Sequence, residues 1–309
     1  MKVSVVIPAY EVQDHLQRAV TSVFAAGYPD LEVVIVDDGS RDGTLAVARR
    51  LSTKEGRIRV LQHPAAGHRG AGASRNLGIM ASTGEIIAFL DGDDWYFENR
   101  FAVSLPILRD RPDVDGVYES ARIELEDGGS WFGGAERRFG ILEPLEGTAL
   151  LSKLLSGQPW PTTAFTCRRG FLDRTGLFPE HLHIAEDCHL WFRMACLGRL
   201  VAGKAEAPVS AYYRHAANTY HPALDRKLDM VKVMADVWNW SRGVKMATDR
   251  RTALLTGVRD YIWNGVVACR KQDRDALAWE LLGAARRFGG WRLLAERRFW
   301  RQGVAMICR

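Results

Sequence analysis

The first 90 residues alternate between short apolar runs and amphipathic segments, and this pattern constrains the fold more than any other feature. The apolar runs are typical of strands buried on both faces, as in parallel sheets. The segments between them have apolar residues three or four positions apart, which predicts helices packed by one face. Strands alternating with helices through short connections indicate βαβ units. We expect strands at residues 2–7, 31–36, 57–61 and 85–90, and helices at 13–26, 44–51 and 73–82.

The fourth expected strand ends in three carboxylates within four positions, Asp91, Asp93 and Asp94. In open α/β sheets, ligands bind at the carboxyl ends of the strands. An Asp-x-Asp turn can also offer oxygen ligands to a divalent cation, which in turn can hold a diphosphate. Because Asp and Gly are ordinary turn residues, a solvated turn is the alternative, and this motif alone does not decide between them.

Composition divides the chain into two parts. Residues 222–309 hold 18 Lys+Arg against 9 Asp+Glu, a net charge of +9, and six of the ten Trp residues. The whole chain carries +5, so residues 1–221 carry −4. We therefore expect an α/β domain over residues 1–221 and a basic, Trp-rich helical extension over residues 222–309.

Two further counts bear on location. The five cysteines show no C-x-x-C spacing, which disfavours disulfides and a structural zinc site and fits a reducing cytoplasm. No apolar run approaches the length of a transmembrane helix, and the amino-terminal run is too short for a signal peptide.

The pattern is looser after residue 94. Helices are expected at 97–108, 145–155 and 185–197, and an extended segment at 114–125 is followed by a hairpin-type turn at 127–129. Short strands are expected at 162–167, 200–201 and 209–213. From residue 224 onward we expect helices, with loops near 241–243 and 289–290.

A glycine-rich loop precedes the third helix. It lacks the third glycine of the dinucleotide-binding fingerprint, where Arg75 stands, and it does not follow the first strand, so a nicotinamide or flavin site is disfavoured. Glycines ahead of a helix, together with Arg75, still suit a phosphate. The alternative is a plain helix start with a surface arginine.

Five segments, taken together in order and spacing, carry a resemblance. They are VSVVIPAYE (3–11), VDDGSRDGT (36–44), GASRNLG (72–78), GEIIAFLDGDD (84–94) and AEDCHLWFR (185–193). They closely resemble the family 2 glycosyltransferases, which have a GT-A fold, a Rossmann-like and mostly parallel sheet. The resemblance extends from Val3 to about Thr219 and implies a nucleotide-diphosphate-sugar donor, a divalent metal, Mn²⁺ or Mg²⁺, and inversion at the anomeric carbon.

The resemblance also assigns roles by position. Asp187 would be the general base, Asp93 would coordinate the metal, and His215 could reach the metal or the diphosphate. Asp38 would hydrogen-bond the base edge, Arg75 would face base or phosphate, and Asp91 would touch the ribose or a metal-bound water. The expected donor-binding set is completed by Pro8, Tyr10 and Glu11, which would line the base and ribose pocket, and by His68, Glu186 and Arg214.

His68 is a departure from the family, which often has Asn seven residues before the arginine of its third motif. Histidine can donate to a base or phosphate as asparagine does, but it titrates near neutrality. Donor binding could therefore depend on pH, or the base preference could differ. The alternative is an exposed loop histidine that binds nothing.

The chemistry supports the same assignment independently. Glycosyl transfer needs a metal to neutralise the leaving diphosphate and a carboxylate to take the proton of the attacking hydroxyl. Adjacent helical residues point about 100° apart, so only one of Glu186 and Asp187 should face the pocket, and we expect Asp187. A helix N-terminal pair favoured by the macrodipole is the alternative for these two acids.

The carboxyl-terminal residues alternate arginines with aromatic side chains. This favours an anionic membrane surface, which would place the enzyme at the inner face of the plasma membrane beside a lipid-linked acceptor. Packing onto the catalytic domain or self-association is as well supported, because the helical wheel does not separate cleanly. Nucleic-acid binding is disfavoured by the acidic catalytic part and the lack of a binding motif.

We therefore expect a cytoplasmic, metal-dependent, inverting glycosyltransferase. A UDP-sugar is the favoured donor, and the acceptor would be a hydroxyl of a glycan, a lipid-linked saccharide or a metabolite. A sugar nucleotidyltransferase of the same fold is one alternative, although residues 8–11 do not look like its lysine-containing glycine-rich loop. A non-catalytic binding or scaffold protein is the other, and the intact acids argue against it.

Overall fold

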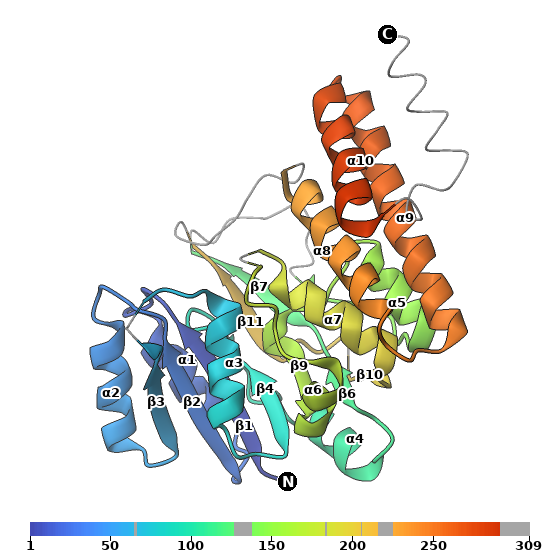
Figure 1. The fold of residues 1–309 in the computed structure, drawn as a ribbon. Coiled ribbons are helices and arrows are strands. Elements are labelled where there is room, and N and C mark those ends of the chain that lie inside the picture. Colours follow the sequence, from blue (N-terminus) through green and yellow to red (C-terminus); the bar gives the residue numbers. More distant parts are fainter. Residues whose placement is uncertain (65–66, 127–137, 183, 205, 216–224, 291–309) are drawn as a thin grey trace. The chain divides into compact units, whose positions relative to one another are not determined.

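The computed structural model describes residues 1–64, 67–126, 138–182, 184–204, 206–215 and 225–290 (Figure 1). Contacts divide the chain into two compact units, and each is described here by itself. The first unit comprises Met1–Glu146, Pro159–Leu190 and Gly198–Asn218, and the second comprises Gly147–Gln158, Trp191–Leu197 and Thr219–Arg309. The boundary expected between residues 221 and 222 falls in the stretch 216–224, outside the described residues.

The first unit is built on a seven-stranded sheet, and it confirms the expected mostly parallel α/β architecture. Only β9 runs antiparallel to its neighbours, β4 and β6, while the other neighbouring strands are parallel. All seven residues of β2 are buried, as a strand covered on both faces requires. In spatial order the strands are β10 (Leu200–Ala202), β6 (Gly116–Tyr118), β9 (Phe165–Arg168), β4 (Ile86–Phe89), β1 (Val3–Ala9), β2 (Leu31–Asp37) and β3 (Ile58–Gln62).

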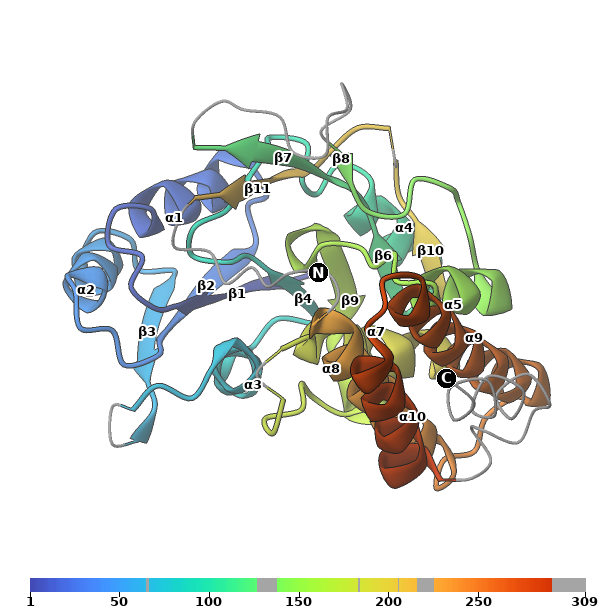
Figure 2. The ribbon, with the colours of Figure 1, turned by 90° about the horizontal axis from the view of Figure 1, so that it is seen from above.

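Helices cover both faces of this sheet (Figure 2). On one face α1 (Leu16–Ala25), α2 (Thr44–Lys54) and α4 (Ser104–Asp110) bury apolar side chains in one hydrophobic core, which also holds alternate residues of β1 and β2. On the other face α3 (Ala71–Ala81) lies against the sheet. A Cβ at Gly78 of α3 would stand 2.4 Å from Val6 Cγ1, so this glycine allows the helix to approach β1 closely.

A second, four-stranded sheet belongs to the same unit. Its order is β5 (Trp95–Tyr96), β11 (Ser210–Arg214), β7 (Ala121–Leu125) and β8 (Arg138–Phe139). The strand expected at 162–167 begins later, because Thr162–Ala164 form a short 3₁₀ turn before β9. Helix α6 (Arg169–Thr175) was not expected, and α7 (Glu186–Leu197) was. The turn predicted at 127–129 lies outside the described residues.

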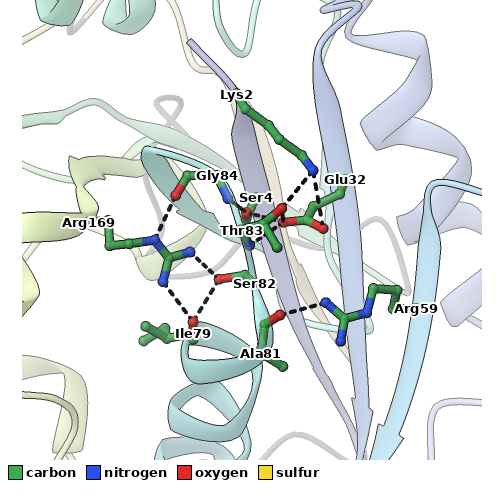
Figure 3. A network of polar contacts seen from close by, with 10 residues as sticks. All are labelled: Lys2, Ser4, Glu32, Arg59, Ile79, Ala81, Ser82, Thr83, Gly84 and Arg169. Atoms are coloured by element: carbon green, nitrogen blue, oxygen red, sulfur yellow. Dashed lines mark hydrogen bonds and ion pairs between the residues drawn. The ribbon is translucent and has the colours of Figure 1, made fainter.

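A polar network joins the amino ends of the strands (Figure 3). The buried Glu32 carboxylate accepts hydrogen bonds from the Ser4 hydroxyl and from both the N–H and the hydroxyl of Thr83, and it pairs with Lys2 at 3.7 Å. Burial alone would raise the pKa of Glu32, but these hydrogen bonds bring it below its ordinary value. Arg169 donates to the Ile79 carbonyl at the end of α3 and to Ser82 and Gly84 in the turn that follows. The network thus fixes the edge of the sheet opposite to the acidic strand ends.

The second unit is helical. It contains α5 (Gly147–Leu155), α8 (Asp225–Ser241), α9 (Thr248–Lys271) and α10 (Asp275–Gly289), and α8 and α10 end near the predicted loops. A Cβ at Gly257 of α9 would lie 2.5 Å from Leu155 Cδ1, so these two helices pack closely. None of the described helices combines the length and apolar content that crossing a bilayer requires. Most of the arginine- and aromatic-rich tail, from residue 291, lies outside the described residues.

Candidate active site

The candidate residues gather at the carboxyl ends of β1, β2 and β4 in the first unit. Pro8 lies within β1, and the exposed Glu11 follows it with a left-handed φ of 51°. The Glu11 N–H donates to Ser40 Oγ at 3.1 Å, which ties the loop after β1 to the loop after β2. Strain of this kind in a non-glycine residue is common at functional sites, where the surrounding structure holds it in place.

Asp38 lies beyond the end of β2 and is only 2% exposed. Its carboxylate accepts the backbone N–H groups of Arg69 and Gly70, each at 2.8 Å. His68 Nδ1 lies 3.0 Å from the same carboxylate. The Tyr10 and His68 rings contact each other, with centroids 4.1 Å apart. The structure therefore brings together three predicted donor-binding residues, with Asp38 holding the loop before α3.

Arg75 is buried in α3 and links two predicted parts of the site. One guanidinium nitrogen donates to Asp91 Oδ1 at 2.7 Å and another to Glu186 Oε1 at 2.8 Å. Burial by itself would lower the pKa of Arg75, but Asp91 and Glu186 raise it above its ordinary value. A Cβ at Gly72 would stand 3.1 Å from Glu186 Cγ, so glycine leaves room for this ion pair. The acids at the end of β4 and the start of α7 thus meet around one cation.

Asp187 and Glu186 have different partners, as their angular separation on a helix predicts. Asp187 Oδ2 lies 3.4 Å from the Thr162 hydroxyl, and Oδ1 accepts the backbone N–H of Cys188 at 2.7 Å. Burial, with the neighbouring Asp187 next in importance, raises the pKa of Glu186. Ala185, directly before α7, has a φ of 58°, another left-handed non-glycine residue in the site.

The two predicted metal ligands are adjacent in space. His215 Nε2 lies 3.1 Å from Asp93 Oδ2, although 122 positions separate them in sequence. Burial, followed by the charge of Asp91, raises the pKa of Asp93. The neighbouring Asp94 is turned toward β11, where it accepts the Tyr213 N–H at 2.8 Å. Burial, followed by the charges of Asp93 and Asp91, raises the pKa of Asp94 well above its ordinary value.

One carboxylate and one imidazole make a limited donor set. Within the described part of the chain, no three His, Cys, Asp or Glu side chains are arranged as a metal site. Mg²⁺-type sites commonly use one or two protein ligands together with substrate phosphates. Asp93 and His215 fit a divalent cation that is completed by a diphosphate.

Sequence reasoning missed two residues beside this pair, both in the first turns around α1. Arg18 stacks on Trp95 at 3.7 Å and on Tyr213 at 4.7 Å, and it donates to the backbone carbonyl of Asp93 at 3.2 Å. The ring of His15 lies 5.0 Å from that of His215. Burial, then His215, lowers the pKa of His15. No local spacing on α1 signals either contact.

Several other candidates have clear positions. Arg214, in β11, lies over the Tyr212 ring at 4.8 Å. Trp160 and Trp191 are fully buried, so they fill core and cannot stack on a sugar. Cys188 is also buried.

Known structures share this fold. S. aureus TarS in complex with UDP-GlcNAc matches with a TM-score of 0.60 at 18% identity, covering 98% of this chain and 92% of that one. The mannosyltransferase PcManGT from Pyrobaculum calidifontis, in complex with GDP-Man and Mn²⁺, matches with a TM-score of 0.60 at 20% identity, covering 100% and 81%. These likenesses show a GT-A fold.

Sequence relatives identify the family. The family model described as Glycosyl transferase family 2 matches residues 4–142. Glycosyltransferase AglE of Haloferax volcanii is 28% identical over 253 residues, which cover 78% of this chain and 75% of AglE. An uncharacterized glycosyltransferase of Nostoc, alr2836, is 31% identical over 230 residues, covering 72% and 68%. RC0461 of Rickettsia conorii is 27% identical over 202 residues, and the match spans 30% of its length. Since the matched segment holds the acidic strand ends described above, this chain belongs to glycosyltransferase family 2.

Proposed function

We propose that this chain transfers a sugar, with inversion, from a nucleotide-diphosphate donor to a hydroxyl group. The observation that carries the proposal is the Arg75 bridge between Asp91 and Glu186, because it joins the donor-side acids to the helix that bears Asp187. A donor held at the strand ends would then have a carboxylate nearby for the attacking hydroxyl. TarS and PcManGT, whose structures contain UDP-GlcNAc and GDP-Man, support a nucleotide-sugar donor.

The reaction is a single displacement. The acceptor oxygen forms a bond to the anomeric carbon, and the bond from that carbon to the diphosphate oxygen breaks. The bonding electron pair leaves with the diphosphate, and Asp187 takes the proton of the hydroxyl as general base. Thr162 and the Cys188 N–H hold the Asp187 carboxylate, which orients it for this transfer.

Asp93 and His215 would hold Mn²⁺ or Mg²⁺. Such a cation supplies positive charge that offsets the negative charge developing on the leaving diphosphate. The Mn²⁺ bound in PcManGT supports this assignment. Arg18 fixes the backbone of Asp93, and Asp94 ties the same loop to β11, so the chain itself sets the orientation of this ligand pair.

The finer assignments extend this proposal. A UDP-sugar is the donor, and the acceptor is a glycan, a lipid-linked saccharide or a metabolite, used in the cytoplasm at the membrane surface. Supporting this, the exposed side of α10 presents Trp279, 42% exposed, with the exposed Arg286 and Arg287. An aromatic beside basic residues suits an anionic lipid surface. Vesicles with and without phosphatidylglycerol test this, and equal sedimentation of the protein with both would refute the membrane assignment.

The central test combines binding and turnover. UDP, GDP, dTDP and CDP are titrated calorimetrically with and without Mn²⁺, and nucleotide release from the matching sugar conjugate is then measured. Asp187→Asn should keep nucleotide binding but lose turnover by roughly 10²- to 10⁴-fold, the usual contribution of a general base. Asp93→Ala should abolish the Mn²⁺ dependence of binding.

A matched control guards against a general effect of removing a helix-terminal acid. Asp249 occupies the first turn of α9 as Asp187 does that of α7, and Asp249→Asn should leave turnover unchanged. Wild-type turnover in Asp187→Asn would show that this carboxylate is not the base. Unchanged Mn²⁺ dependence in Asp93→Ala would remove it as a ligand.

A further inference from the structure

Asp38 is almost completely covered by the protein. A carboxylate offers about four lone-pair positions, and here two of them accept backbone N–H groups while two histidine rings lie close by. Oδ1 accepts the Arg69 N–H at 2.8 Å and lies 3.5 Å from His63 Nε2. Oδ2 accepts the Gly70 N–H at 2.8 Å and lies 3.0 Å from His68 Nδ1. With 2% exposure, Asp38 anchors the loop before α3 and presents no free oxygen to a nucleobase.

His68 and Tyr10 are the accessible groups at the same place. The side chain of His68 is 55% exposed, and Tyr10 is 38% exposed. Their rings are tilted by 37° with centroids 4.1 Å apart, so each leaves part of its surface open. Aromatic side chains stack readily on nucleobases, since every base has a π-face. The polar edge next to this aromatic surface belongs to His68.

The contact with Asp38 fixes the proton on His68. Nδ1 lies 3.0 Å from a carboxylate oxygen that only accepts hydrogen bonds, so a bare nitrogen lone pair would be repelled there and the neutral ring carries its hydrogen on Nδ1. In the neutral imidazole the other nitrogen, Nε2, is then an acceptor. It can accept the ring N–H of uracil, thymine or guanine, whereas cytosine and adenine present a bare ring nitrogen at the corresponding edge.

We propose that His68 is a specificity residue, whose Nε2 accepts the ring N–H of the donor's base while the base lies against Tyr10. The inference rests on the proposed function, because it requires a nucleotide diphosphate at the strand ends. It gives His68 the base-reading role that the family resemblance implies for Asp38, and it selects UDP, dTDP or GDP conjugates over CDP conjugates at neutral and higher pH.

Protonation reverses this preference. An imidazolium has N–H donors on both nitrogens, so Nε2–H then suits the bare ring nitrogen of cytosine and repels the N–H of uracil. Asp38 faces His68 from the end of β2, Tyr10 faces it from the end of β1, and His63 Nε2 lies 3.5 Å from the same Asp38 carboxylate. Arg69, next in the loop, lies 3.6 Å from Glu180. The change of preference comes from Nε2, the nitrogen that meets the base.

The test is the ratio of UDP affinity to CDP affinity, measured calorimetrically with saturating Mn²⁺ between about pH 5.5 and about pH 8.5, the range in which histidine titrates. Titration of the diphosphate and of the metal ligands affects both nucleotides alike and cancels in the ratio. We expect the ratio to fall by roughly threefold to tenfold on acidification, the usual net effect of losing one hydrogen bond at a partly exposed site. GDP and ADP offer the same contrast if the site prefers purines.

Three variants make the test specific. His68→Phe keeps an aromatic ring without nitrogens, and His68→Asn restores the residue common in the family, so both should give a ratio independent of pH. His181→Asn removes another exposed histidine and should retain the wild-type pH dependence. A constant ratio in the wild type, or a pH-dependent ratio in His68→Phe, would overturn the inference. If no nucleotide binds to the folded protein, the proposed function itself fails.

Discussion

Arg75→Met removes the cation that joins the end of β4 to the start of α7. The substitution keeps a long apolar side chain in contact with Phe178, over whose ring the guanidinium lies at 5.3 Å. It leaves Glu186, whose side chain is 14% exposed, and Asp91, 27% exposed, without their common partner. The loss therefore reports the electrostatic contribution of the bridge more than its packing.

The structure sets the size of the expected effect. Breaking a fully buried ion pair by removing one partner costs about 3–5 kcal/mol. Because both acids retain some contact with solvent, we expect the lower end, about 3 kcal/mol. For a domain of this size each kcal/mol shifts the melting temperature by roughly 2–4 °C, so Arg75→Met should melt roughly 6–12 °C below the wild type.

The deficit should also depend on pH. Burial and the neighbouring Asp187 already raise the folded-state pKa of Glu186 above 4.5, its value in the unfolded chain. The contribution of Glu186 to stability therefore falls as pH rises from 4.5 through the folded-state pKa. Without Arg75 the folded-state pKa rises further, and the fall extends to higher pH. The gap between Arg75→Met and the wild type should therefore widen on going from acid to neutral pH.

Thermal unfolding followed by circular dichroism measures this gap. Arg57→Met, which breaks an exposed pair with Glu55 at 2.7 Å, is the matched control and should melt with the wild type. Adding Glu186→Gln to Arg75→Met should recover part of the loss, since the unpaired carboxylate is then gone. A melting temperature within 1 °C or so of the wild type, at a pH where Glu186 is ionised, would refute the reasoning, given the roughly 2–4 °C per kcal/mol expected.

Three further predictions follow from other contacts. Gly78→Ala would force a Cβ against Val6 and should destabilise the protein by about 1–3 kcal/mol. The control Gly283→Ala, where a Cβ would meet nothing within 4 Å, should stabilise the protein by about 0.5–1 kcal/mol. Similar melting temperatures for the two variants would contradict the close packing of α3 on β1. Burial raises the pKa of Glu119 from 4.5 to about 7, so its contribution to stability falls between these values as pH rises. Over that range the free energy of unfolding of Glu119→Gln should rise relative to that of the wild type by up to about 3 kcal/mol, and a constant difference would argue against a raised pKa. Arg18→Leu should weaken Mn²⁺-dependent nucleotide binding by roughly 10- to 100-fold, because Arg18 orients Asp93 and loss of such a supporting group typically has an effect of this size. Unchanged binding would show that Arg18 does not orient the metal ligand.

The sequence predicted the elements whose pattern is local. Strand β2 is buried along its whole length, which explains why residues 31–36 are apolar except for Glu32, whose buried carboxylate is held by hydrogen bonds. The loops near 241–243 and 289–290 also lie where predicted, because glycine and serine there interrupt a helical pattern. By contrast, β9 pairs antiparallel between β4 and β6, with Ile86 opposite Arg168, and no local signal encodes a partner so distant. Helix α6 is only seven residues long, too short for a clear apolar period.

The candidate site shows the same division. The resemblance selected Asp93 and His215, and the fold places them 3.1 Å apart. It also selected Arg75, but expected it to face base or phosphate, and only the three-dimensional arrangement shows which acids surround it. Arg18 was missed because its partner Trp95 is 77 positions away, beyond any helical spacing. Residue type indicates what a side chain can bind, and packing decides which partner it meets.

The network around Glu32 has a consequence for protein engineering (Figure 3). Ser4, Glu32 and Thr83 tie the amino ends of β1, β2 and β4 together, whereas His68, Tyr10 and the acids lie beyond the carboxyl ends. A library that randomises the carboxyl-end loops would leave these hydrogen bonds untouched. Donor specificity could then be diversified on an intact foundation, and the residues of Figure 3 are the ones to hold constant in its design.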